Sequence, residues 1–172
     1  RQIYEEGSLP LDDIDKIDIF IYQAAINLTG NIDIPKDPGE AKFALKYALA
    51  TSMNTGNYTL ENLHPDQTLT PAIRSLVERT TITKDDSLEI RARRIRGTRV
   101  EFTMRSGEKK VFTVLVPKGD PEDFVTEKEL LGKLAFCAKG FYDETRQAEI
   151  CSYVQALDQY DEIGGLFRLL KL

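Results

Sequence analysis

The residues whose types and positions are best suited to chemistry are Glu40 and Lys42, in the segment PGEAKFALKYALA. They follow a long loop and stand at the predicted beginning of a helix, where unpaired backbone amides and the helix dipole favour a carboxylate ligand. A lysine at this position can offer a cation to such a ligand, although it can also be an ordinary solvated lysine. We therefore predict Glu40 and Lys42 as substrate-binding residues, with solvation of Lys42 as the alternative.

Other acidic residues come in groups that have a plain structural explanation. The carboxylates of LDDIDKID alternate along a predicted strand and are expected to be solvated. Asp85 and Asp86 are expected in a turn, and Asp158 and Asp161 at a helix cap. General acid–base catalysis would require one carboxylate of a pair to be buried enough to shift its pKa, and these patterns do not indicate such burial.

The sequence carries no pattern for a metal ion or an organic cofactor, and we predict neither. His64 is the one histidine in the sequence, and a single histidine argues against a multi-histidine metal site. We expect His64 to cap or pack a loop. Neither GxGxxG nor GxxxxGK[ST] occurs. Cys137 and Cys151 lie on the apolar stripes of predicted helices without metal-ligand spacing. Buried thiols are expected there, with a disulfide between the helices or a reactive thiol as alternatives.

The charge balance argues against nucleic acid as a partner. The formal net charge is -5 and the pI is about 5.1, so the protein lacks a general field that would attract phosphate backbones. The local exception is a cluster at a strand entrance, which is expected to be a solvated edge: Arg91, Arg93, Arg94, Arg96 and Arg99. Apolar runs are too short to cross a bilayer, so we expect a soluble protein without a membrane partner. No secretory segment precedes the two cysteines, so we expect a reducing, cytoplasmic compartment.

The periodic pattern of apolar side chains predicts the helices and strands that position the candidate residues. Alternation of apolar side chains predicts a strand at residues 14–22, followed by a loop over 23–40 and a helix over 40–55. Thr70 and Pro71 open another helix, residues 80–84 form a strand, and 99–105 and 109–116 form a hairpin. Three more helices follow, the first two capped by Thr126 and Asp143. The order predicts an α+β fold, in which a small mixed or antiparallel sheet is covered by helices mainly on one face.

The chain starts at Arg1 instead of a methionine and runs directly into the first predicted strand. We therefore expect an internal start, with residues 1–12 as a linker from a preceding domain and residues 13–172 as one domain.

Five distinctive segments follow one another along the chain: PGEAKFALKYALA, TGNYTLENL, TPAIRSLVERTTI, VPKGDPEDFVTEKELLGKLAF and LDQYDEIGGLFRLL. In this order they resemble motifs of the C-terminal domain of the MmgE/PrpD family, which includes 2-methylcitrate dehydratases, cis-aconitate decarboxylases and iminodisuccinate epimerases. The first segment resembles the EAKFS-type motif that opens the main helix of that domain, and the resemblance covers roughly residues 14–172. Ala44 stands where the family commonly has serine, and Phe124 where it has proline, which leaves the subfamily open.

The resemblance implies one domain of a larger, cofactor-free lyase or isomerase that acts on small polycarboxylates, such as the hydro-lyase 2-methylcitrate dehydratase of propionate metabolism. It implies a homodimer whose active site lies between an N-terminal helical domain and this smaller, lid-like domain. Most catalytic residues are then expected in the helical domain, so this chain alone is expected to be inactive. Lys42 and Glu40 would lie on a wall of the cleft.

A different class of function stays open on the residues alone. The chain can instead be a non-catalytic α+β binding or interaction module, whose motif matches reflect shared architecture only.

Overall fold

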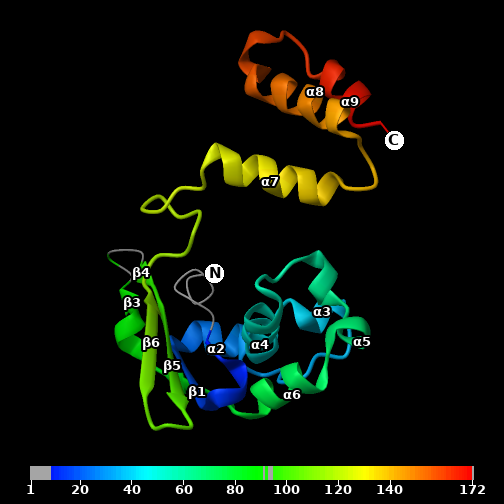
Figure 1. The fold of residues 1–172 in the computed structure, drawn as a ribbon. Helices are drawn as coiled ribbons and strands as arrows, with labels where there is room; N and C mark the ends of the chain where they lie inside the picture. The colour runs from blue at the N-terminus through cyan, green and yellow to red at the C-terminus, as the bar shows by residue number, and fades with distance from the viewer. Residues whose placement is uncertain (1–8, 91, 93–94, 172) are drawn as a thin grey trace. The chain divides into compact units, whose positions relative to one another are not determined.

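The computed structural model describes residues 9–90, 92 and 95–171. The chain forms two compact units, Arg1–Pro117 and Lys118–Leu172, which we call the sheet unit and the C-terminal unit and describe separately. In Figure 1 the sheet unit runs from blue to green and the C-terminal unit from yellow to red. The composition of the sequence does not signal this division.

The sheet unit is built on a mixed sheet of four strands in the order β2–β1–β5–β6 (Figure 1). These strands are β1 (Ile14–Ile21), β2 (Thr80–Lys84), β5 (Thr98–Met104) and β6 (Lys109–Val114). β1 pairs with β2 in parallel and with β5 in antiparallel orientation, and β5 and β6 form a hairpin. β3 (Glu89–Ile90) and β4 (Ile95–Arg96) form a separate two-stranded sheet. The predicted strands and the α+β fold are confirmed.

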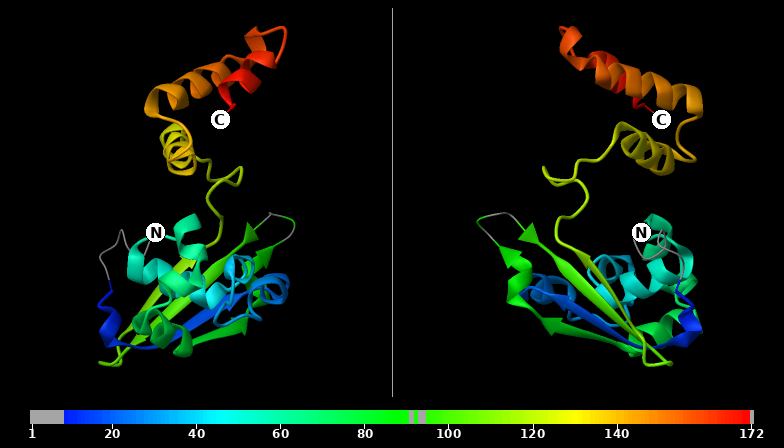
Figure 2. Two further views of the ribbon diagram at one scale, coloured as in Figure 1. Left: turned by 90° about the vertical axis from the view of Figure 1, so that its right-hand side faces the viewer. Right: turned by 60° about the vertical axis from the view of Figure 1, so that its left-hand side comes forward.

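One face of the sheet is buried under helices. Side chains alternate along a strand, so Ile17, Ile19 and Ile21 of β1 share this face, and all three are buried. Helices α4 (Leu45–Thr55) and α6 (Pro71–Glu78) pack against each other and contribute to the same core. Figure 2 shows the helices of the sheet unit gathered on one side of its strands. The main residues of the core are Ile14, Ile17, Tyr47, Ala50, Ile73, Leu76, Val77, Phe102 and Met104.

The helices and helical turns of the sheet unit are short, and their ends follow local signals. Thr70 accepts a hydrogen bond from the Ile73 amide and Pro71 stands in the first turn of α6, as predicted. Gly56 ends α4 with φ 83°, a left-handed conformation that favours glycine. The helical segments are η1 (Leu11–Asp13), α2 (Gln23–Thr29), α3 (Pro38–Ala41), α4 (Leu45–Thr55), η2 (Leu60–Leu63), α5 (Pro65–Thr68), α6 (Pro71–Glu78) and η3 (Asp86–Leu88).

The stretch 23–40, predicted to be a loop, contains two helices, so that prediction was wrong. α2 follows directly after β1, and the Gln23 side chain donates to Asn27 Oδ1 one turn later, at 2.7 Å. Gly30 ends this helix. The glycines and prolines of the stretch led to the prediction of a loop, although QAAINL before them contains residues that form helices well.

The helix predicted over residues 40–55 is interrupted. α3 ends at Ala41 and α4 begins at Leu45, with Ala44 between them at φ −95° and ψ 85°. The Phe43 amide donates to the Glu40 carbonyl at 2.9 Å, a three-residue spacing that tightens the turn and closes α3. Glu40 thus lies in the first turn of a helix, as predicted, whereas Lys42 lies just beyond the end of that helix.

The C-terminal unit consists of α7 (Glu127–Ala138), α8 (Glu144–Gln155), η5 (Leu157–Gln159) and α9 (Gly164–Leu169). Thr126 and Glu129 form the predicted capping box, and Asp143 caps α8 by accepting from the Arg146 amide. The stacked rings of Tyr153 and Tyr160, with centroids 4.2 Å apart, connect α8 to the segment before α9.

Apolar side chains of the C-terminal unit are much more exposed than the sequence predicts. Among its described residues, 118–171, the hydrophobic side chains that are buried belong to Ala138 and Ile150. Cys137 is exposed and Cys151 half-buried, and both are free thiols, so the prediction of buried cysteines was wrong. No helix in the described part of the chain is both long and apolar enough to cross a membrane.

Candidate functional site

The site is built on the tight segment that joins α3 to α4. Asp37 opens α3 by accepting a hydrogen bond from the Glu40 amide at 2.9 Å. Pro38 stands in the first turn, where its missing N–H costs nothing. Beyond the turn at residues 42–43, α4 begins without a side-chain cap, because the methyl side chain of Ala44 has no hydrogen-bond acceptor. Serine, common at this position in the family that the sequence resembles, would supply that cap.

Glu40 holds the segment together. Its carboxylate oxygen Oε2 accepts from the Lys36 amide at 2.8 Å, across the turn that leads into α3. The carboxylate is therefore already engaged within the chain. A carboxylate would also repel an anionic ligand. The predicted contact of Glu40 with a substrate stays a prediction.

Lys42 presents a cation to solvent. Its side chain is exposed, and none of residues 9–90, 92 and 95–171 forms an ion pair with it. The neighbouring Lys46 differs, because its ammonium is paired with Asp33 at 2.8 Å and is largely shielded. An ammonium without such a partner keeps its full capacity to bind a carboxylate ligand. The role of Lys42 in binding a substrate stays a prediction.

Two tyrosines that the sequence analysis did not single out support this segment. The Tyr58 hydroxyl donates to the carbonyl oxygen of Ala41 at 2.7 Å, directly before Lys42. The Tyr58 ring packs edge-on against Tyr47, which is fully buried, with ring centroids 6.1 Å apart. Burial, and to a lesser degree the neighbouring Tyr47, raises the pKa of Tyr58 to about 12. No sequence signal identifies these contacts, because the fold joins Tyr58 to residues 11 and 17 positions before it.

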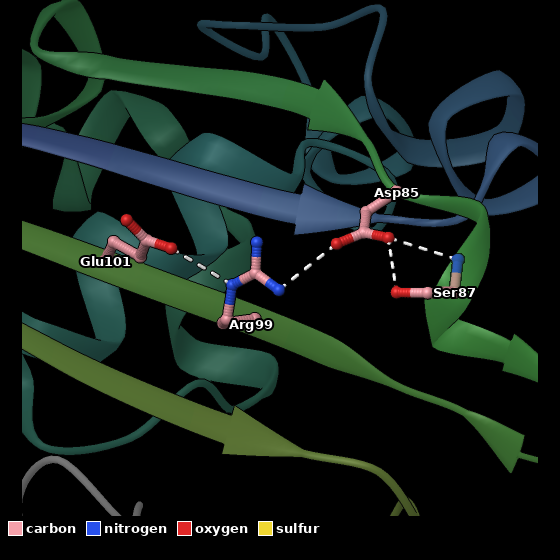
Figure 3. A network of polar contacts seen from close by, with 4 residues as sticks. All are labelled: Asp85, Ser87, Arg99 and Glu101. Carbon is pink, nitrogen blue, oxygen red and sulfur yellow. Dashed lines mark hydrogen bonds and ion pairs between the residues drawn. The ribbon is translucent and has the colours of Figure 1, made fainter.

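The sequence predicted Arg99 in a solvated edge, and this was wrong. Arg99 belongs to a polar network on the open face of the sheet (Figure 3). It lies on the inner strand β5 and donates to Asp85 at 3.1 Å and to Glu101 at 3.0 Å. Its guanidinium also stacks over the Phe20 ring, 4.3 Å from the centroid. Arg99 is thus paired with two carboxylates. Arg91, Arg93 and Arg94 lie outside the described residues.

The two acidic pairs differ from each other in the structure. Asp158 lies inside η5 and Asp161 in the bend before α9, and since the residues that cap these segments are Ala156, Tyr160 and Ile163, the prediction of a helix cap for this pair was wrong. Asp85 caps η3 as the sequence predicted for a turn, and its Oδ1 accepts from the Ser87 amide. The hydrogen bonds from Ser87 and the charge of Arg99 lower the pKa of the Asp85 carboxyl. His64 is exposed and precedes α5, where its carbonyl accepts from the Gln67 and Thr68 amides. In the part of the chain that the structure describes, no group of three or more His, Cys, Asp or Glu side chains could hold a metal ion.

The C-terminal unit carries an apolar groove of about 310 Å³ between α7 and α8. Gln155 donates to Glu127 at 2.6 Å beside it. The side chains that line it are almost entirely apolar, so the groove suits a protein side chain better than a charged small molecule. These residues include Leu130, Leu131, Leu134, Ile150, Cys151 and Val154.

These features define a small α+β domain that presents an exposed lysine on a well-supported turn, together with apolar helices of the kind that pack against another protein surface. The family model of the MmgE/PrpD C-terminal domain matches residues 1–159. The chain therefore belongs to the MmgE/PrpD family. Comparison with curated proteins finds no match for the sequence.

Proposed function

We propose that this chain is the lid-like C-terminal domain of a cofactor-free lyase or isomerase that acts on a small polycarboxylate, as 2-methylcitrate dehydratase does. The family assignment supports the class of enzyme. The observation that carries the site is Lys42, an exposed ammonium with no ion-pair partner among the described residues, on a segment held by Glu40 and Tyr58. Its role is to bind one carboxylate of the substrate, and Glu40 supports it from within the protein.

The acid and base groups of such an enzyme lie, in this proposal, in a helical domain outside the chain. Proton chemistry next to a carboxylate needs a group whose pKa is matched to the reaction. The pKa values of Asp18 and Asp85 are lowered, and both carboxylates form hydrogen bonds on the open face of the sheet. Neither is placed beside Lys42 by any contact. Lys42 therefore contributes binding, and the chain alone is expected to be inactive.

The exposed apolar side chains of the C-terminal unit support the proposed partner, which is the helical domain of the same enzyme. A unit of this size that buries so few apolar side chains gains little free energy from its own core. Covering Leu130, Phe141 and Phe167, which are among the exposed large hydrophobic residues, would stabilise it. In the proposal the complete enzyme is a cytoplasmic homodimer.

The test is the substitution Lys42→Ala in the full-length enzyme, assayed with 2-methylcitrate. A charge-assisted hydrogen bond contributes about 1.5–3 kcal/mol, so we expect KM to rise about 10- to 100-fold. Because Lys42 contacts a carboxylate that does not react, kcat should change little.

The matched control is Lys46→Ala, since Lys46 lies four residues away but is paired with Asp33. It should leave KM near the wild-type value. Equal KM values for Lys42→Ala and wild type would remove Lys42 from the site, and activity of the isolated 172-residue chain would contradict the placement of the acid and base groups.

A further inference from the structure

The end of α3 leaves a backbone carbonyl that needs a donor from elsewhere in the protein. The last carbonyls of any helix lack intrahelical partners, and Ala41 is both the last residue of α3 and fully buried. Within the segment, the Ala44 amide approaches the Ala41 carbonyl only at 3.4 Å. The Tyr58 hydroxyl reaches the same oxygen at 2.7 Å. Tyr58 is therefore the strong donor to this carbonyl.

Tyr58 is itself held in place on two sides. Its ring packs edge-on against Tyr47, whose hydroxyl donates to the Asn62 carbonyl at 3.0 Å. The next residue, Thr59, begins η2 with a capping box formed with Asn62. The pKa of about 12 keeps the Tyr58 hydroxyl protonated, so it remains a donor across the physiological pH range. Tyr58 thus links the turn before α4 to the buried core.

The contact made by Tyr58 differs from the other contacts that shape the Lys42 turn. Asp37 and Glu40 act within a few residues, through the Glu40 and Lys36 amides. Tyr58 acts from the far end of α4 and meets the chain one residue before Lys42. Loss of this bond frees the backbone that carries the ammonium, while the local contacts of α3 remain.

We propose that Tyr58 is a positioning residue for Lys42: its hydroxyl fixes the Ala41 carbonyl and so fixes the direction in which Lys42 meets a substrate carboxylate. This inference rests on the proposed function, because it requires that Lys42 binds substrate. Positioned groups bind more tightly than mobile ones, since less conformational entropy is lost on binding.

The test uses Tyr58→Phe, Lys42→Ala and the double variant of the full-length enzyme, with 2-methylcitrate as substrate. Tyr58→Phe removes one hydroxyl and keeps the ring. We expect it to raise KM about 3- to 10-fold with kcat nearly unchanged, because one neutral hydrogen bond is lost. If Tyr58 acts through Lys42, Tyr58→Phe should have no further effect on KM in the Lys42→Ala background.

A matched control is Tyr142→Phe. The Tyr142 hydroxyl donates to the Leu170 carbonyl at 2.7 Å, the same kind of bond at the same length, within the C-terminal unit. This variant should leave KM unchanged. A rise in KM equal to that of Tyr58→Phe would mean that the loss of any such bond lowers affinity, which would overturn the inference.

A second measurement separates failure of the inference from failure of the proposed function. In the 172-residue chain, Tyr58→Phe should increase amide hydrogen exchange at Lys42, Phe43 and Ala44 more than in α6. Unchanged exchange there overturns the positioning role. Independent effects of Tyr58→Phe and Lys42→Ala on KM overturn it too, as does a normal KM for Tyr58→Phe when Lys42→Ala raises KM. A normal KM for Lys42→Ala contradicts the proposed function itself.

Discussion

The two units of the chain reach their structures in different ways. The sheet unit has a closed apolar core between one face of the sheet and its helices, with Tyr47, Phe102 and Ile14 fully buried. The C-terminal unit has well-formed helix caps and hydrogen-bonded tyrosines, but leaves Phe124, Phe141 and Phe167 more than half exposed. Long-range packing therefore stabilises the first unit, and mostly local interactions define the second.

The two kinds of packing suit different functions. A closed core holds a functional side chain in place, and Lys42 stands on a turn that is tied to such a core by Tyr58. Helices with uncovered apolar faces are suited to association, because burying those faces supplies the free energy that their own packing lacks. In our proposal the sheet unit supplies a wall of the active site, and the C-terminal unit attaches that wall to the rest of the enzyme.

The largest effect on the free energy of unfolding is expected when a core residue of the sheet unit is replaced, and an apolar residue of the C-terminal unit serves for comparison. Phe102 is fully buried, so Phe102→Ala should lower the free energy of unfolding by about 3–5 kcal/mol. Leu130 is 56% exposed, so Leu130→Ala should change it by about 0.5 kcal/mol. Urea unfolding of the 172-residue chain, followed by circular dichroism, measures both. Similar losses for the two variants would contradict the difference between the units.

An intermediate effect is expected where the C-terminal unit does pack tightly. A Cβ at Gly165 would lie 2.5 Å from Cε2 of the Tyr153 ring, whereas a Cβ at Gly164 has no neighbour closer than 3.5 Å. Gly165→Ala should therefore destabilise the packing of α9 on α8 by about 1–3 kcal/mol. Gly164→Ala is the matched control and should leave it intact. Amide hydrogen exchange in α9 reports the difference, and equal protection in the two variants would show that α9 does not depend on Tyr153.

The smallest effect is expected for two buried hydroxyl groups of the sheet unit, one without and one with a hydrogen-bond partner. Thr51 is buried, and its hydroxyl has no hydrogen-bond partner within the described residues. Thr51→Val keeps the shape and removes the unpaired hydroxyl, so it should stabilise the chain by about 1 kcal/mol. Thr80→Val should destabilise it by about the same amount, because the Thr80 hydroxyl donates to the Leu76 carbonyl at 2.7 Å. Thermal unfolding would reveal the opposite signs, and a lower midpoint for Thr51→Val would contradict the expectation.

Local sequence signals determined most of the elements and several of their ends. Alternating isoleucines predicted β1, Thr70 and Pro71 predicted the start of α6, and Thr126 with Glu129 predicted the cap of α7. These signals succeed because they depend on the period of one element or on hydrogen bonds that span only three or four residues. The ordered motifs also predicted the MmgE/PrpD family, which is confirmed.

The surroundings of the candidate site and the burial of the apolar stripes depend on contacts between distant parts of the chain. The break between α3 and α4 occurs next to a carbonyl that takes its strongest hydrogen bond from Tyr58, distant in sequence. Leu130 and Cys137 lie at helical positions that periodicity assigns to a core, yet they are exposed. Periodicity reveals which side of a helix is apolar, but what covers that side depends on the rest of the fold. For Lys42, the sequence determined the charge, and the tertiary structure decided that the charge is exposed and its backbone held.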